Sequence, residues 1–272
     1  MTDPGYEIWD GSIYDHPKYY DLVFGADCAA ESAFILECAD RYCQSPSSKV
    51  RLFEPACGTG RLLWFLSRRG YSVAGLDLNA AAVAYCNDRF ERRGEKPPAW
   101  VADMSDFRSP RRFDVAFNTI NSFRHLTTAS AAKSHMDAMA AAVRPGGLYL
   151  LGVHLTPTAV PPSDGESWSA RRGHVAVNTH MWFIDRDSRK RIERFGIYFD
   201  IHRPVGTARI NDVLVLRSYT RLQMNRFLQS CKQWQIVQTY DFAYDMDLPI
   251  TVDDATEDVV YVLRRTDSGS TT

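Results

Sequence analysis

Glu54-Pro55-Ala56-Cys57-Gly58-Thr59-Gly60-Arg61 is the stretch that decides the fold of this chain, because it joins an apolar run to an amphipathic one through a glycine-rich turn. Val50–Phe53 before it is typical of a buried strand, and Thr59–Arg69 is typical of a helix. Glycine lets the backbone approach a ligand closely. A strand-turn-helix unit of this kind directs helix N–H groups into the crevice where nucleotide-like ligands bind, although a tight turn without a ligand stays open as the alternative.

Working outward from the turn, short apolar runs alternate with amphipathic helices from residue 50 to residue 154. Asn79 is placed to cap one of these helices. Continuous apolar strands that alternate with helices indicate a parallel sheet covered on both faces. The further strands that we predict are Tyr71–Leu76, Ala99–Ala102, Phe113–Asn118 and Leu148–Val153, and the further helices are Ala80–Arg93 and Ala131–Val143.

The pattern changes after His154. Pro157–Ser167 is rich in Pro, Ser and Gly and is typical of a loop. Three alternating segments joined by polar turns then indicate an antiparallel meander: Val175–Phe183, Ile192–Ile201 and Ile210–Tyr219. A helix and two strands follow and complete the first sheet: Arg221–Cys231, Gln235–Phe242 and Val259–Arg264. We therefore predict an α/β fold with a doubly wound, Rossmann-like, seven-stranded sheet and an inserted antiparallel β meander.

The composition of the chain disfavours several classes of binding partner. Its 272 residues carry 32 Lys+Arg against 33 Asp+Glu, and this balance disfavours nucleic acid as a partner. The acidic N-terminus lacks the apolar run of a signal peptide, and no stretch approaches the roughly 20 apolar residues of a membrane span. The six cysteines form no C-x-x-C pair, which disfavours a disulfide framework or a zinc site. We expect a cytoplasmic protein without a metal or a membrane partner, and a homodimer stays open.

Two acidic residues near the turn, Asp77 and Glu54, indicate which class of cofactor it would bind. Asp77 lies 19 residues after Gly58, about the spacing at which an acid meets ribose hydroxyls. NAD is the obvious alternative, but Leu63 stands where its fingerprint has a third glycine, and Glu54 would repel a pyrophosphate. The same Glu54 suits the cationic amino end of an amino-acid cofactor, and the small Cys57 leaves room for it. S-adenosylmethionine is such a cation.

The ends of the third and fourth strands supply the remaining candidates. Asp103 can accept a hydrogen bond from the adenine amino group while Met104 packs on the ring, although Asp103 could instead cap the next turn. Asn118, Thr119 and His125 follow the fourth strand and face the position of the reacting methyl group. An ordinary packing or helix-start role is the alternative for His125.

The motif order E-x-A-x-G-x-G, G-L-D, A-D-M and F-D-x-x-x-N resembles the class I S-adenosylmethionine-dependent methyltransferases. The run Asn121–Leu126 is similar to N-S-F-x-H-L of glycine N-methyltransferase, and the inserted meander is similar to that of N,N-dimethyltransferases of nucleotide-linked amino sugars. The resemblance implies S-adenosylmethionine as cofactor and S-adenosylhomocysteine as product. The cofactor contacts that we expect are Tyr20, Glu54, Ala56, Cys57, Gly58, Gly60, Asp77, Leu78, Asp103, Met104, Asn118, Thr119 and His125.

The chain departs from this pattern at two places. Ala56 stands where the family often has glycine. Glycine N-methyltransferase carries an arginine after its N-terminal tyrosine that holds the cofactor carboxylate, and residues 25–32 contain none. The group that would hold this carboxylate is therefore open, and glycine is disfavoured as the methyl acceptor.

These patterns predict a chain of three structural parts that catalyses methyl transfer. Residues 1–48 form an N-terminal helical lid, 49–156 with 220–266 the Rossmann-like cofactor domain, and 157–219 a β insertion over the acceptor site. The predicted reaction is methyl transfer to a small molecule, at an amine nitrogen first and an oxygen second. His125 and His154 are the candidate bases, although His154 could instead hold the first loop of the insertion.

Two other functions stay in view. One is a non-catalytic S-adenosylmethionine-binding module or regulator. The other is an RNA or protein methyltransferase, which the balanced charge and the absence of an Asn-Pro-Pro-Tyr tetrad after the fourth strand disfavour.

Overall fold

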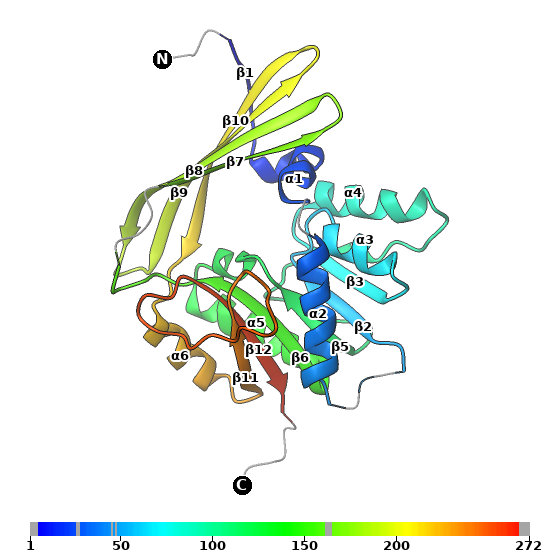
Figure 1. Ribbon diagram of the computed structural model, residues 1–272, viewed down its shortest axis with the longest axis vertical. Coiled ribbons are helices and arrows are strands. Elements are labelled where there is room, and N and C mark those ends of the chain that lie inside the picture. Colours follow the sequence, from blue (N-terminus) through cyan, green and yellow to red (C-terminus); the bar gives the residue numbers. More distant parts are fainter. Residues whose placement is uncertain (1–4, 26–27, 45, 47, 161–164, 267–272) are drawn as a thin grey trace.

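Two β-sheets of different construction make up the computed structural model, which describes residues 5–25, 28–44, 46, 48–160 and 165–266 (Figure 1). The larger sheet has seven strands in the order β11-β12-β6-β5-β2-β3-β4. Each of the seven strands predicted for it overlaps an observed one, and the predicted doubly wound α/β fold is confirmed. Its strands are β2 (Arg51–Pro55), β3 (Ser72–Asp77), β4 (Ala99–Val101), β5 (Phe113–Asn118), β6 (Val143–His154), β11 (Trp234–Tyr240) and β12 (Asp258–Arg265).

Helices cover both faces of this sheet because its central strands are apolar on both sides. Along β6, Leu148 and Leu150 pack into one core while Tyr149 and Leu151 pack into the other. The first core contains α2 (Cys28–Tyr42), α3 (Arg61–Ser67) and α4 (Ala80–Glu91), and the second contains α5 (Ala129–Ala142) and α6 (Arg221–Ser230). Asn79 caps α4 as predicted, since its side chain accepts hydrogen bonds from the N–H groups of Ala81 and Ala82. None of the described helices is long and apolar enough to cross a membrane.

The second sheet is larger than the predicted three-stranded meander. It has five strands in the order β1-β10-β9-β8-β7, and β1 joins its edge in parallel to β10. Its strands are β1 (Glu7–Trp9), β7 (Gly165–Arg172), β8 (Val175–Asp187), β9 (Ile192–Arg203) and β10 (Gly206–Arg217).

The two missed strands are the two edges of that sheet. β7 begins inside the stretch 157–167, which we expected to be a loop and of which 161–164 lie outside the described residues. An edge strand has one neighbour and needs little apolar sequence, and in β7 only Trp168 and Ala170 pack against the core. β1 is only three residues long and lies in the segment that we expected to be helical.

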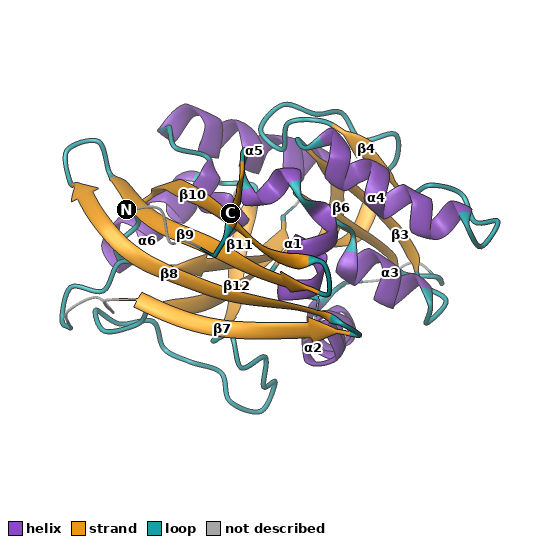
Figure 2. Cartoon of the chain, turned by 90° about the horizontal axis from the view of Figure 1, so that it is seen from above, coloured by secondary structure: helices purple, strands orange, loops and turns teal. Residues whose placement is uncertain are grey.

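The N-terminal segment is divided between the two sheets. Leu22 and Val23 of α1 (Pro17–Phe24) pack with Val177 and Phe199 of the second sheet, whereas α2 packs with the seven-stranded sheet. Figures 1 and 2 both show α1 lying between the two sheets. The two helices α1 and α2 therefore pack against different sheets.

A buried ion pair joins the second sheet to the tip of the first. Arg124 follows β5 in the short helix η2 (Ser122–His125), and its guanidinium pairs with the carboxylate of Glu193 on β9. Arg124 also donates through Nε to the carbonyl of Arg217, at 2.8 Å, and Thr156 donates to Glu193 at 3.0 Å. Both charged side chains are only 4% exposed. The further hydrogen bonds satisfy polar atoms that burial removes from water, and they fix the geometry of the pair.

Gly60 is the point at which the turn meets the body of the domain. Its φ of +68° lies in the left-handed region, and a Cβ atom there would sit 2.2 Å from Sγ of Cys86 on α4. Gly70 also has a positive φ, +86°, but a Cβ atom there would meet nothing within 4 Å. A side chain at either glycine would be strained by the positive φ, but only a side chain at Gly60 would also collide with a neighbour.

We expect Gly60→Ala to destabilise the fold more than Gly70→Ala. Both variants carry the left-handed penalty of about 1–2 kcal/mol, and Gly60→Ala adds an overpacking cost of about 1–3 kcal/mol. Urea unfolding of the two variants and the wild type measures the difference. Equal losses for the two variants would show that the contact with Cys86 is unimportant.

Candidate active site

The turn after β2 takes a conformation that L-residues rarely adopt. Ala56 and Gly58 have φ of +54° and +52°, and Gly60 follows in the same region. The N–H of Cys57 donates to the carbonyl of Leu76 at 2.8 Å, so the turn lies against the end of β3. Ala56 therefore occupies a strained position, which is where the resembling family often has glycine.

Asp77 is aimed at this turn from the end of β3. Its Oδ2 accepts from the N–H of Gly58 at 2.7 Å, and its Oδ1 accepts from the N–H of Asn79 at 2.8 Å. Burial raises the pKa of its carboxyl group, and these backbone hydrogen bonds oppose the shift. Leu78, next in the chain, is 72% exposed beside it. Each carboxylate oxygen has a second lone pair, so Asp77 can still accept from a ligand.

Glu54 is the buried acid of the site. It is 7% exposed, and its Oε2 is buried without a hydrogen-bond partner among the described residues. Burial raises the pKa of this carboxyl group, while the positive charge of Arg61 opposes the shift. A buried carboxylate without a partner is unfavourable. A cationic group bound beside Glu54 would remove that penalty.

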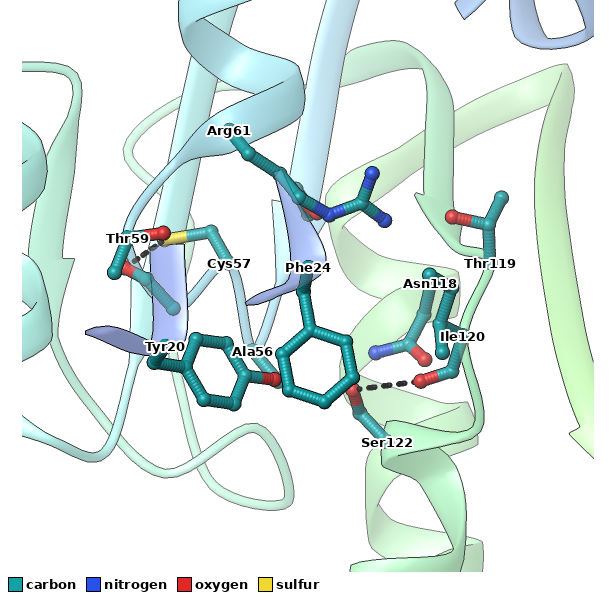
Figure 3. A pocket seen from close by; sticks show the side chains of 12 residues that line it. Tyr20, Phe24, Ala56, Cys57, Thr59, Arg61, Asn118, Thr119, Ile120 and Ser122 are labelled. Atoms are coloured by element: carbon teal, nitrogen blue, oxygen red, sulfur yellow. Dashed lines mark hydrogen bonds between the residues drawn. The ribbon is translucent and has the colours of Figure 1, made fainter. Parts of the chain in front are cut away.

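The end of β5 forms the opposite wall (Figure 3). Asn118 donates through Nδ2 to the carbonyl of Pro55 at 3.0 Å, and its Oδ1 is buried without a partner among the described residues. Thr119 donates its hydroxyl to Glu31 of α2. Glu31 in turn forms a two-point pair with Arg61, the first residue of α3.

Aromatic side chains of α1 cover the turn. A Cβ atom at Gly58 would lie 3.8 Å from Cε1 of Tyr20, so this ring sits directly over the glycine. The ring of Phe24, one helical turn later, lies 4.6 Å from that of Tyr20 between centroids. The resulting pocket is lined by Tyr20, Phe24, Glu54, Ala56, Cys57, Gly58, Thr59, Arg61, Asn118, Thr119, Ile120 and Ser122.

One carboxylate fixes this lid. Asp21 of α1 is 2% exposed and accepts from the hydroxyl of Thr59 in the turn at 3.0 Å. It also pairs with Arg89 of α4, and with Arg172 of β7 at 3.0 Å. Asp21 therefore ties α1 to the turn, to a helix of the first sheet and to an edge of the second.

The predicted adenine-side residues follow Asp77 at the same sheet edge but do not line this pocket. The N–H of Ala102 donates to the carbonyl of Asp77 at 3.0 Å. Asp103 caps the next turn, since its Oδ1 accepts from the N–H and hydroxyl of Ser105 at 2.7 and 2.8 Å. Met104 is 9% exposed and packs in the core. Their roles toward a cofactor stay predictions.

The two candidate bases also lie outside the lining of this pocket. Nε2 of His125 is 3.1 Å from the hydroxyl of Tyr14, and burial together with the charge of Arg124 lowers the pKa of this histidine. His154 contacts the carboxylate of Asp258 and packs against the ring of Phe242. Both catalytic roles stay predictions.

Five residues that line the pocket are not among the predicted cofactor contacts: Phe24, Thr59, Arg61, Ile120 and Ser122. Two of them carry a signal in the sequence. Phe24 follows Tyr20 at i+4, which places both on one helix face, and Arg61 directly follows the glycine turn.

Known proteins resemble this chain in sequence and in fold. Residues 53–147 match the family model of a methyltransferase domain. The chain is 28% identical over 159 residues to dTDP-3-amino-3,4,6-trideoxy-alpha-D-glucopyranose N,N-dimethyltransferase of Streptomyces venezuelae, covering 57% of this chain and 62% of that protein. It is 30% identical over 163 residues to dTDP-3-amino-3,6-dideoxy-alpha-D-glucopyranose N,N-dimethyltransferase of Streptomyces fradiae, covering 59% of this chain and 61% of that protein. The matches thus span less than two thirds of these relatives' length.

Solved structures show the same fold over almost the whole chain. An S-adenosylmethionine-dependent methyltransferase from Clostridium acetobutylicum superposes with a TM-score of 0.72 at 18% identity, covering 93% of this chain and 98% of that one. The sugar N-methyltransferase KedS8 from Streptoalloteichus gives 0.71 at 19% identity, covering 96% of each chain. The predicted resemblance to class I methyltransferases and to amino-sugar N,N-dimethyltransferases is confirmed.

We expect Asp21→Asn to loosen the lid. The substitution keeps the shape of the side chain but removes the charge that faces Arg89 and Arg172, at a cost of about 1–3 kcal/mol. Hydrogen exchange should quicken across residues 17–24 more than across α2. Asp40→Asn, at an exposed position of α2, is the matched control. Unchanged protection of 17–24 would contradict the role given to Asp21.

Proposed function

We propose that this chain is an S-adenosylmethionine-dependent methyltransferase that acts on a small molecule, at an amine nitrogen in preference to an oxygen. The observation that carries the proposal is Glu54, a buried carboxylate with an unpartnered oxygen beside a strained glycine turn. The methyltransferase-domain match over residues 53–147 covers this turn and supports the proposal.

The residues of the site fit this cofactor. Glu54 would accept from its amino group, Asp77 would accept from its ribose hydroxyls, and Tyr20 would cover it above Gly58. The bound cofactor supplies an electrophilic methyl group on a sulfonium. Acidic side chains around the turn favour such a cation over a dinucleotide.

The chain itself would contribute position and the exclusion of water. Tyr20 and Phe24 screen the pocket from solvent, and Asp21 holds them there. Positioning of two reactants can supply several kcal/mol without a covalent step. An amine needs only to be neutral when it attacks, whereas a hydroxyl needs a base in place. The names of the relatives, which are N,N-dimethyltransferases, favour nitrogen.

An amino sugar is the acceptor class that we favour. The relatives in Streptomyces are named as N,N-dimethyltransferases of dTDP-linked amino sugars, and the similar structure KedS8 is a sugar N-methyltransferase. The second sheet would cover this acceptor, because α1 fixes its inner face beside the pocket. We propose that residues 1–48 form a lid, that 49–156 and 220–266 form the cofactor domain, and that 157–219 form the insertion.

Incubation with a labelled methyl donor tests the function directly. We expect the labelled methyl group to pass to dTDP-linked amino sugars. The matching sugars with a hydroxyl in place of the amine should accept less label. A chain that binds S-adenosylhomocysteine but labels no amine or hydroxyl acceptor would instead be the non-catalytic binding module.

Cofactor affinity should depend on pH through Glu54. Burial raises the pKa of this carboxyl in the free protein, and protonation removes the charge that attracts the ligand's amino group. Affinity for S-adenosylhomocysteine should therefore fall as pH decreases through that raised pKa. Glu54→Gln should bind about 10–100-fold more weakly, with a flatter pH profile.

Isothermal calorimetry over a pH series measures both effects. Glu37→Gln, at a half-buried position of α2 where the carboxylate pairs with Arg41 and does not line the pocket, is the control and should retain the wild-type profile. A profile that stays steep in Glu54→Gln would assign the pH dependence to another group.

A further inference from the structure

We propose that Arg61 binds the carboxylate of the cofactor's amino-acid end, an inference that rests on the proposed function. The sequence leaves this contact open, because residues 25–32 contain no arginine. The structure supplies a cation from another element. Arg61 begins α3 immediately after Gly60, and it lines the pocket together with Glu54.

The side chain of Arg61 is directed into the site. It is 13% exposed, and Figure 3 shows its guanidinium pointing from α3 toward Thr119. Among the described residues that line the pocket, Arg61 is the only lysine or arginine. A carboxylate bound in this pocket therefore has one cationic side chain to meet.

One donor edge of this guanidinium is already occupied. Nη2 donates to Oε1 of Glu31 at 2.8 Å, and Nη1 donates to Oε2 of the same residue. Nη1 also lies 3.7 Å from Sγ of Cys28. Glu31 is thus the group that holds the orientation of Arg61, and it is itself 2% exposed.

The other donor edge is open. A guanidinium has five N–H donors in a planar fork, and Nε with the adjacent Nη2 forms a second parallel pair suited to a carboxylate. None of the described residues accepts a hydrogen bond from Nε of Arg61. Arg61 can therefore keep its pair with Glu31 and bind a second carboxylate at the same time.

The charges around the pocket match an amino acid in its zwitterionic form. Glu54 presents a negative group and Arg61 a positive one, and Arg61 lowers the pKa of Glu54 against the effect of burial. An ammonium beside Glu54 and a carboxylate beside Arg61 would each meet the opposite charge. Glu31 neutralises part of the charge of Arg61, so the site keeps the acidic balance that a cationic cofactor requires.

The competing explanation is that Arg61 only ties α3 to α2 through Glu31. The two roles predict different ligand dependence. A tie between helices would affect every ligand of the pocket equally, whereas a carboxylate contact would affect only ligands that carry a carboxylate.

Calorimetry with two ligands separates the roles. The first ligand is S-adenosylhomocysteine, and the second is its decarboxylated analogue, which keeps the adenosine, thioether and amine. We expect the wild type to bind the first at least about tenfold more tightly. Arg61→Met should lose that factor for S-adenosylhomocysteine and stay within about twofold for the analogue, with Arg61→Lys intermediate. Arg68→Met, at the exposed end of α3, should behave as wild type for both.

Three other outcomes of the calorimetry would contradict the proposal. Equal losses of both ligands in Arg61→Met would overturn the proposal in favour of a structural tie. Equal affinity of the wild type for the two ligands would overturn it without any variant, even if Arg61→Met does not fold. Failure of the wild type to bind either ligand would refute the proposed function, and this inference with it.

Discussion

The burial of Glu54 at the end of β2 is the constraint on which the site depends. Parallel strands bring their carboxyl ends to one edge, so Glu54, Asp77 and Asn118 meet around the glycine turn. There the protein removes a carboxylate from water and leaves its Oε2 without a partner among the described residues. Such a group destabilises the fold unless a cation approaches it. The strained turn, the carboxylate of Asp77 and the charge of Arg61 all lie around this group.

A second buried carboxylate connects this site to the rest of the molecule. Asp21 lies on α1, yet its partners belong to the turn, to α4 and to β7. The core of the second sheet contains α1, and β1 extends that sheet at its far edge. α1 and the second sheet therefore pack together, and they contact the rest of the chain through Asp21, through the pair of Arg124 with Glu193 and through neutral contacts such as the one between Asn79 and Tyr14. Glu31 is the corresponding group on the other side, since α2 packs with the first sheet.

The sequence predicted the seven-stranded sheet well because its central strands are buried on both faces, which makes them continuously apolar. The edges of the second sheet were missed for the opposite reason, since Gly165–Arg172 is too polar to be distinguished from a loop. At the site, Glu54 and Asp77 could be placed because strand ends fix them. The contacts of Asp21 and Glu31 could not, because their partners lie 30 or more positions away in the chain and come together only through packing. Arg61 was visible in the turn, but its direction depends on Glu31.

The packing of α1 against the second sheet bears on the order in which cofactor and acceptor would bind. Tyr20 and Phe24 close the pocket from α1, and α1 is fixed to the sheet that would cover the acceptor. Any movement of α1 that admits a cofactor must therefore also shift the second sheet or break the core that contains Leu22 and Val23. Parting Asp21 from Thr59 and Arg89 returns one buried carboxylate to water, whereas separating α1 from the second sheet would expose the apolar core that they share. The two thus move together, and a bound cofactor, by closing α1, would complete the site for its acceptor.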